Sequence, residues 1–231
     1  MESQSKDLKE EKYSQLLIDI TAHQLRSSLS SANWYMEMIL EKDDSHLTAD
    51  EREYLHEIEN AHERMSELVN ILLSMAKIEL GTFELKPEPM DLKALLNKLV
   101  GIVKPKVLEK KLVFEQKVPE GPFIFEADPK VVAIVLENII SNAVKYTPTE
   151  GRVTLEVSRN DKTVLVRVAD TGYGIPKEQQ AQIFTRFFRA NNAQVKQPEG
   201  NGLGLYIVKT LVEKMGGRVW FESEENKGTT F

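Results

Sequence analysis

Cysteine is missing from the 231-residue sequence, so disulfide scaffolds, thiolate metal sites and cysteine nucleophiles are excluded. Long apolar runs are missing too, since the longest, at residues 131–136, is far shorter than the roughly 20 residues that cross a membrane. The N-terminal segment MESQSKDLKEEK is charged and lacks the apolar core of a signal peptide. A soluble chain is therefore expected, and its redox compartment stays open.

Basic charge is also scarce. The chain has 30 Lys and Arg against 36 Asp and Glu, a net charge of −6, which argues against a general nucleic-acid binder because phosphate backbones require basic surface. Hydrophobic residues make up 41% and charged residues 29%, an ordinary globular balance that excludes wholesale disorder. The length suits two modest domains, or a helical module and an α/β domain.

Two long amphipathic helices are predicted in residues 1–80. Apolar residues recur at spacings of three and four over residues 8–40, without an intervening Gly or Pro. After the break at EKDDSHL, Thr48 and Glu51 indicate a capping box, from which a second amphipathic helix runs to about Gly81. The two helices are expected to form an antiparallel hairpin.

This hairpin cannot bury both of its apolar stripes completely by itself. The economical solution is a four-helix bundle made by two copies of the chain, so a homodimer is predicted. The alternative, in which the hairpin packs on the C-terminal half of its own chain, stays open at this point.

Beyond Gly81, shorter helices alternate with strands. Pro87 and Pro89 indicate a linker over residues 81–90, and residues 91–231 are predicted to form a second domain. Predicted helices cover residues 91–109, 129–145 and 203–215, with a short helix from about 176, and predicted strands cover 112–118, 152–158, 163–169 and 218–223. Residues 191–201 are predicted to be a polar loop. The mixture indicates a two-layer α/β sandwich.

The first of four polar segments in this domain lies near the end of a predicted helix. Asn138 and Asn142 share one helix face, and Lys145 follows about one turn later. Two amide oxygens and an ammonium group can hold a hard cation and the phosphates that it bridges. A solvated helix face would look the same, so this segment alone is weak evidence.

The second and third segments add a carboxylate and two guanidinium groups. Asp170 follows a predicted strand and precedes Gly172 and Gly174, so it can accept a hydrogen bond from an amino group where a flat ring approaches the backbone closely. Arg186 and Arg189 alternate with phenylalanines in FTRFFR, and their geometry suits phosphate. Turn formation and core packing explain the glycines and phenylalanines equally well.

The fourth segment is glycine-rich and opens a helix. Gly200, Gly202 and Gly204 follow a polar loop, and glycine-rich backbone at a helix N-terminus can hold phosphate. The segment does not follow a strand, which excludes a dinucleotide-binding βαβ unit. Each segment alone is a modest signal, but the four together in this order are a strong one.

In this order the four segments resemble the N, G1, F and G2 boxes of the sensor histidine kinases. Residues 21–29, TAHQLRSSL, resemble the H box of the same family's dimerisation and phosphotransfer domain. The resemblance covers nearly everything from about residue 16 to residue 231. The related ATPases gyrase, Hsp90 and MutL share the ATP-binding fold and lack an H box.

The resemblance implies phosphoryl transfer from ATP with Mg²⁺. His23 would be the phospho-acceptor, because a neutral imidazole can attack the γ-phosphate. Asn142 would bind Mg²⁺ through its amide oxygen, and Asn138 would support the metal and phosphate site. Lys145 would approach the phosphates, and Tyr146 would pack beside the nucleotide.

The resemblance also assigns roles to the other three segments. Asp170 would accept a hydrogen bond from the adenine amino group, while Gly172 and Gly174 admit the ring. Arg186 and Arg189 would meet the phosphates or the phosphotransfer interface, Arg189 as a catalytic residue. A mobile ATP lid would cover roughly residues 190–201, flanked by the cofactor-binding residues Gly200, Gly202, Leu203 and Gly204.

Two H-box positions depart from the family's pattern. Gln24 stands where the family has an acidic residue, and an amide cannot act as a base at neutral pH, so slow kinase activity is expected. Gln24 and Ser27 are also weak substitutes for the family's phosphatase residues, so weak phosphatase activity is expected. Ser28 replaces the family's usual Pro, which predicts a straighter first helix around His23.

The predicted function is that of a homodimeric histidine kinase core, which autophosphorylates His23 from Mg-ATP and passes the phosphoryl group to an aspartate of a response regulator. The chain lacks a sensor module, so it is expected to be the cytoplasmic part of a longer, membrane-bound sensor. One alternative is a dimeric ATP-binding scaffold that transfers no phosphate. Another is an ATP-driven conformational machine, against which the H box argues. The remaining histidines, His46, His56 and His62, are predicted to lie at the surface.

Overall fold

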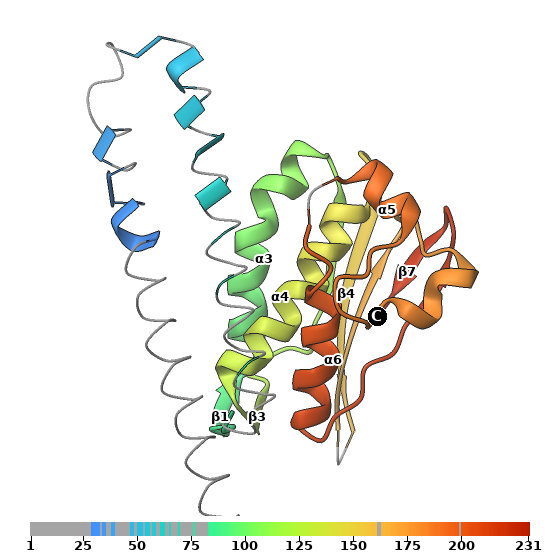
Figure 1. Cartoon of the computed structure of the whole chain (residues 1–231). Coiled ribbons are helices and arrows are strands. Elements are labelled where there is room, and N and C mark those ends of the chain that lie inside the picture. The colour runs from blue at the N-terminus through green and yellow to red at the C-terminus, as the bar shows by residue number, and fades with distance from the viewer. Residues whose placement is uncertain are drawn as a thin grey trace, which may run out of the picture. The chain divides into compact units, whose positions relative to one another are not determined.

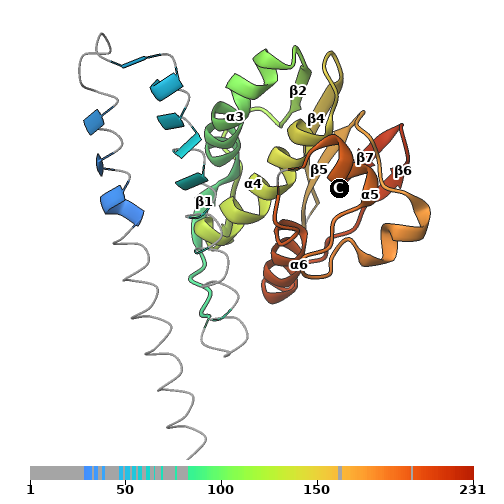
Figure 2. The same ribbon diagram turned by 45° about the horizontal axis from the view of Figure 1, so that its top comes forward.

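The computed structural model describes residues 83–160, 163–198 and 200–231, and earlier in the chain residues 29–32, 34–35, 38–39, 47–48, 50–52, 54–55, 57–58, 61–62, 65, 69 and 76 (Figures 1 and 2). It divides into two compact units, Met1–Glu84 and Leu85–Phe231. Among these described residues, no helix is long and apolar enough to cross a membrane.

The N-terminal unit is helical wherever residues 29–39 and 50–76 are described. The predicted capping box is confirmed, since the Thr48 N–H donates to Glu51 Oε2 at 2.8 Å and the Glu51 N–H donates to Thr48 Oγ1 at 3.3 Å. These bonds satisfy backbone donors that the first turn of the second helix cannot pair internally. The capping box therefore explains where this helix begins.

His62 lies on the inner side of this unit. Its side chain is 7% exposed, and Nε2 lies 2.6 Å from the Leu29 carbonyl oxygen. The prediction that His62 is a surface residue is wrong, because it shares a seven-residue spacing with the partly buried Leu55, Val69 and Ala76. The other histidines, together with Gln24, Ser27 and Ser28, lie outside the described residues.

The second unit contains a mixed five-stranded sheet and a separate two-stranded ribbon. The sheet order is β2 (Val113–Lys117), β4 (Arg152–Arg159), β5 (Val164–Asp170), β7 (Gly228–Thr230) and β6 (Glu222–Glu224), with β2 and β4 parallel and the other neighbours antiparallel. The ribbon pairs β1 (Glu88–Asp91) with β3 (Ile124–Ala127) in antiparallel register.

Three helices lie side by side over one face of the sheet in Figures 1 and 2: α3 (Leu92–Glu109), α4 (Pro129–Tyr146) and α6 (Gly204–Lys214). The central helix, α4, contacts both other helices as well as β4 and β5. The side chains of Asp91 and Asp128 cap the first turns of α3 and α4, which begin where the sequence predicts helices. The predicted α/β architecture of this region is confirmed.

Several short elements differ from the prediction. The last predicted strand begins at Glu222 rather than at residue 218 and pairs with β7. The ribbon of β1 and β3 was not predicted, because its strands are short and pair across more than 30 residues of chain. The predicted polar loop contains the short helix α5 (Asn191–Lys196), and the helix predicted from residue 176 is the 3₁₀ helix η2 (Lys177–Gln182).

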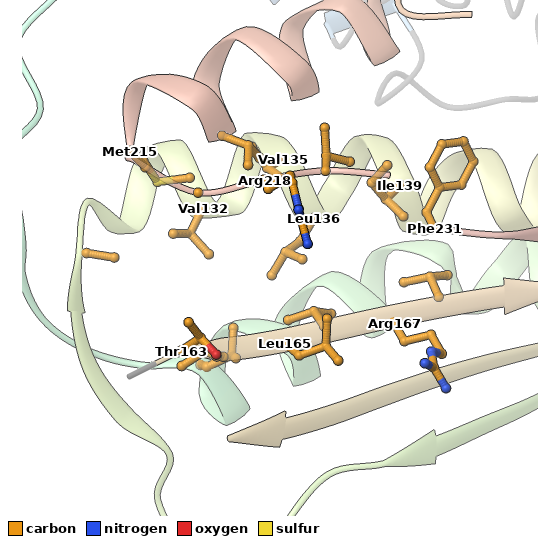
Figure 3. A pocket seen from close by; sticks show the side chains of 18 of the residues that line it. Val132, Val135, Leu136, Ile139, Thr163, Leu165, Arg167, Met215, Arg218 and Phe231 are labelled. Atoms are coloured by element: carbon orange, nitrogen blue, oxygen red, sulfur yellow. The ribbon is translucent and has the colours of Figure 1, made fainter. Parts of the chain in front are cut away.

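A cavity of about 1620 Å³ lies between α4 and β5 (Figure 3). Its walls are largely apolar and include Val132, Leu136, Leu165 and Phe231. Strand β7 pairs with β5 at Ala169 and Asp170, and Phe231 exchanges two backbone hydrogen bonds with Val168, so among the described residues only the part of this edge of β5 before Val168 has no neighbouring strand. None of the residues that the sequence assigns to ATP binding lines this cavity.

Candidate functional site

The last turns of α4 carry the first polar segment. Asn138 Nδ2 donates to the Ile134 carbonyl oxygen at 2.8 Å, which holds the amide against its own helix. Its Oδ1 lies only 2.5 Å from where a Cβ on Gly204 would stand. Gly204 is the first residue of α6. Because it has no side chain, the glycine-rich segment can pack closely against α4.

Asn142 lies one turn further along α4 and is half-buried. Within the described residues its side chain makes no hydrogen bond, so the amide oxygen is available as a ligand. The same part of the chain has no group of three His, Asp or Glu side chains that could hold a metal ion. A hard cation at Asn142 would therefore need oxygen ligands from a bound phosphate.

Asp170 is the last residue of β5, and its carboxylate is fixed by two backbone donors. Oδ1 accepts from the Gly172 N–H at 2.8 Å and from the Thr229 N–H at 3.2 Å. Burial raises the pKa of this carboxyl to about 6, although the two amide bonds act in the opposite direction. Above that pH the group is an ionised, oriented acceptor whose Oδ2 accepts no hydrogen bond from the described residues.

The glycines after Asp170 allow the backbone to pack closely. A Cβ on Gly172 would lie 2.5 Å from the Tyr146 carbonyl oxygen, so this loop lies directly against the end of α4. Gly174 has a φ of +62° and its missing side chain makes room for the Glu224 carbonyl group. The space beside both glycines is thus occupied by protein backbone.

The two arginines of the third segment make different contacts. Arg186 stacks on the Tyr206 ring, 4.7 Å from its centroid, and its Nη2 donates to the Tyr206 hydroxyl at 2.7 Å. Arg189 donates to backbone carbonyl groups of residues 193–200, including those of Pro198 at 2.6 Å and Gly200 at 3.2 Å. In this conformation the Arg189 guanidinium organises the predicted lid.

Between these arginines, Phe187 has an unusual backbone conformation. Its φ is +59°, a region that a bulky residue rarely adopts, and its side chain is 66% exposed. Gly202, with a φ of +71°, packs against this backbone, since a Cβ there would lie 2.6 Å from the Phe187 carbonyl carbon. A glycine is therefore required at position 202, just before α6.

The remaining residues of the fourth segment have distinct surroundings. A Cβ on Gly200 would lie 3.4 Å from Lys145 Nζ, so the end of the predicted lid lies next to α4. Leu203 is fully buried and belongs to the core beneath the start of α6. Its N–H donates to Asn201 Oδ1 at 2.9 Å, which helps to begin the helix.

Asn192 connects the lid helix α5 to the loop after Asp170. Its Nδ2 donates to the carbonyl oxygens of Gly174 at 3.0 Å and Tyr173 at 3.3 Å. This role of Asn192 is not visible in the sequence, because an asparagine in a polar stretch carries no signal of a distant partner. The contacts of Thr229 with Asp170 and of Tyr206 with Arg186 were not predicted either, because these partners are also distant in sequence.

The structure thus brings the four predicted segments together. Asn138 meets Gly204, Tyr146 meets Gly172, and Arg189 meets Gly200. The site lies at one end of α4, beside the carboxyl end of β5 and the start of α6. His23 and the rest of the predicted H box lie outside the described residues.

Two family models match the chain, in sequence order. The His Kinase A (phospho-acceptor) domain matches residues 14–81, and the histidine kinase-, DNA gyrase B- and HSP90-like ATPase matches residues 127–231. Together they cover most of the chain.

Curated relatives are similar over nearly the whole chain. The chain is 34% identical to the circadian input-output histidine kinase CikA of Synechococcus elongatus, over 91% of this chain and 28% of CikA. It is 33% identical to the sensor histidine kinase WalK of Bacillus subtilis, over 90% of this chain and 34% of WalK. The chain therefore spans about a third of the length of these relatives.

A solved structure gives the same pattern. Full-length ShkA in complex with AMPPNP matches with a TM-score of 0.72 and 29% identity, over 93% of this chain and 44% of ShkA.

Proposed function

Because the chain belongs to the sensor histidine kinases of two-component systems, we propose that it binds ATP with Mg²⁺ in its α/β unit and phosphorylates His23. The phosphoryl group then passes to an aspartate of a response regulator. Residues 1–80 serve dimerisation and phosphotransfer, residues 81–90 are a linker, and residues 91–231 bind ATP. The parent protein is a longer sensor, whose cytoplasmic part includes this chain.

The Asp170 carboxylate is the observation that carries this proposal. Two backbone N–H groups orient its Oδ1, while Oδ2 accepts no hydrogen bond from the described residues. A buried, oriented acceptor with one remaining oxygen matches an exocyclic amino group such as that of adenine. The guanine ring carries a carbonyl group at the equivalent position, so Asp170 also favours ATP over GTP.

The phosphates would extend from this position toward the end of α4. Lys145 supplies a cation beside the glycine-rich backbone that starts α6, and Asn142 supplies an amide oxygen with no protein partner in the described part of the chain. When bound, Mg²⁺ would neutralise phosphate charge and leave the γ-phosphorus open to attack. Asn138 packs on Gly204 and keeps these two elements together.

Phosphoryl transfer requires His23 to reach the γ-phosphate. A ring nitrogen forms the new N–P bond, the bond to the leaving oxygen of ADP breaks, and the imidazole loses a proton. Gln24 cannot accept that proton at neutral pH. The proton must then pass to water or to another acceptor, so we expect slow phosphorylation of His23.

The dimer is supported by the exposed face of the helical unit. Large apolar side chains that are at least half exposed occur on both helices and include Trp34, Tyr35, Tyr54, Ile58 and Met65. Tyr54, Ile58 and Met65 follow helical spacings and are exposed, whereas His62, at the neighbouring heptad position, is buried. A second copy of the hairpin can cover this stripe in a four-helix bundle.

Incubation with γ-labelled ATP and Mg²⁺ tests the proposal. We expect an acid-labile, base-stable label that is absent from His23→Gln and from Asn142→Ala. ATP binding without any label would favour the alternative of a signalling scaffold, for which Gln24 is the specific observation. A Gln24→Glu variant that then gains label would attribute the lost activity to the missing base.

A further inference from the structure

The carboxyl end of α4 needs partners from outside the helix. The last four carbonyl groups of an α-helix have no partner within it. The Ala143 carbonyl oxygen accepts from the backbone N–H and the hydroxyl of Thr147, at 3.2 and 2.6 Å. The Tyr146 carbonyl oxygen accepts from the Tyr173 N–H at 3.2 Å, which joins the helix to the loop after Asp170.

Lys110 supplies the two remaining bonds. Its Nζ donates to the carbonyl oxygens of Val144 and Lys145, at 2.9 Å each. All four terminal carbonyl groups are thus satisfied by groups outside the helix. Lys110 is the only one of these donors that carries a charge.

The position of Lys110 is itself well defined. It is the C-cap of α3, and its backbone N–H donates to the Lys106 carbonyl oxygen at 3.0 Å. Its own carbonyl oxygen accepts from the Glu150 N–H at 2.9 Å, in the turn that follows α4. The side chain is partly buried, and this burial lowers the pKa of the ammonium group. Hydrogen-bond partners such as these two carbonyl groups offset the cost of partly burying the charge.

We propose that Lys110 is a positioning residue for the nucleotide site, in which its ammonium group fixes the end of α4 and offsets the negative charge of the helix terminus. The proposal rests on the ATP site proposed above. A helix C-terminus carries a partial negative charge, which repels phosphates. Asn142, Lys145 and Tyr146 all lie in the final turns of α4, which Lys110 holds. Removing the Lys110 charge would therefore shift these residues and make the end of the helix that faces the nucleotide more negative.

Lys110→Met in the full chain tests this role, because methionine keeps the length of the side chain and removes its charge. Lys106→Met is the matched control, since Lys106 lies one turn earlier on α3, is exposed and pairs only with Glu109 among the described residues. We expect Lys110→Met to weaken ATP binding about tenfold in calorimetry and Lys106→Met to leave it unchanged. Lys110→Met should weaken the binding of adenosine, which has no phosphates, less than it weakens the binding of ATP.

Two further measurements separate positioning from general stability. Lys110→Arg keeps the charge and should restore most of the ATP affinity. Without nucleotide, Lys110→Met should speed hydrogen exchange at the Tyr173 amide, which bonds to the end of α4, while exchange in β4 stays unchanged.

The outcomes distinguish the two proposals. Unchanged ATP affinity and unchanged Tyr173 exchange in Lys110→Met would overturn the role of Lys110. Equal losses for ATP and adenosine would refute the charge effect. If the unmodified chain bound no ATP, the proposed function would fail, and the exchange at Tyr173 would still decide whether Lys110 holds the helix end.

Discussion

Asp170 shows how burial and hydrogen bonding together define one residue's chemistry. Burial raises its carboxyl pKa from 3.8 to about 6, and two backbone N–H groups hold one oxygen in place. We expect ATP affinity to fall as the pH drops below about 6, because a protonated carboxyl group is a poorer acceptor for the adenine amino group. Calorimetric titrations from pH 5 to pH 8 check this, and a flat profile would contradict it.

The same shift has a consequence for stability. The folded-state pKa of Asp170 lies above the unfolded value. Its contribution to the free energy of unfolding is therefore fully present below about pH 4 and is lost as the pH rises through about 6. Asp170→Asn removes the buried charge and keeps an oxygen acceptor. Without nucleotide it should raise the free energy of unfolding at pH 8 by about 1–3 kcal/mol. The same variant should lose about 100-fold in ATP affinity.

Gly172 is a residue for which the absence of a side chain is a packing requirement. An added Cβ would lie 2.5 Å from the backbone oxygen of Tyr146, which cannot move without disturbing α4. Gly172→Ala should therefore lower the free energy of unfolding by about 1–3 kcal/mol, as measured in a denaturant titration. Gly101 is the control, because nothing lies within 4 Å of its Cβ position in the helix, and Gly101→Ala should stabilise the chain by about 0.5–1 kcal/mol. Equal effects would refute the packing explanation.

At the scale of the elements, side-chain caps explain where three of the helices begin. Asp91, Asp128 and Thr48 each place a side-chain acceptor at the start of a helix, and all three helices begin where the sequence predicts. The short helix α5 is different, because six residues cannot form a stable helix alone. It depends on the hydrogen bonds that its own Asn192 makes to the loop after Asp170 and that Arg189 makes to the Ala193 carbonyl oxygen, which form only in the folded structure.

Asn192 offers a direct test of how the lid is held. Asn192→Ala removes the two hydrogen bonds to the loop after Asp170. We expect amide exchange across α5 to become about tenfold faster, with little change in global unfolding. Asn191→Ala is the matched control, because the neighbouring Asn191 is exposed. Similar exchange in both variants would show that these bonds do not hold α5.

At the scale of the whole molecule, the apolar stripe of the helical unit predicts association. Ile58 is 53% exposed on one chain, and a second hairpin would bury it. Light scattering should give the mass of two chains, and Ile58→Glu should raise the dissociation constant at least about 100-fold, because it buries an unpaired charge. Glu57→Gln, at the adjacent exposed position, should remain dimeric. A monomeric unmodified chain would contradict the dimer.

Sequence alone determined the features that depend on neighbouring residues. Sequence patterns located the helices α3, α4 and α6 and the strands β4 and β5 close to where they lie in the structure. The order of the polar segments indicated the family and the elements of the nucleotide site. These signals are local, so they can be recognised before the chain folds.

Tertiary structure alone decided the contacts between distant residues. Lys110 meets Val144 across 34 residues, and His62 meets Leu29 across 33, so neither role has a local pattern. The ribbon of β1 with β3 and the burial of Leu203 likewise depend on the packed core. Side-chain chemistry can be assigned from sequence, whereas the partner of each polar group follows from how the elements pack.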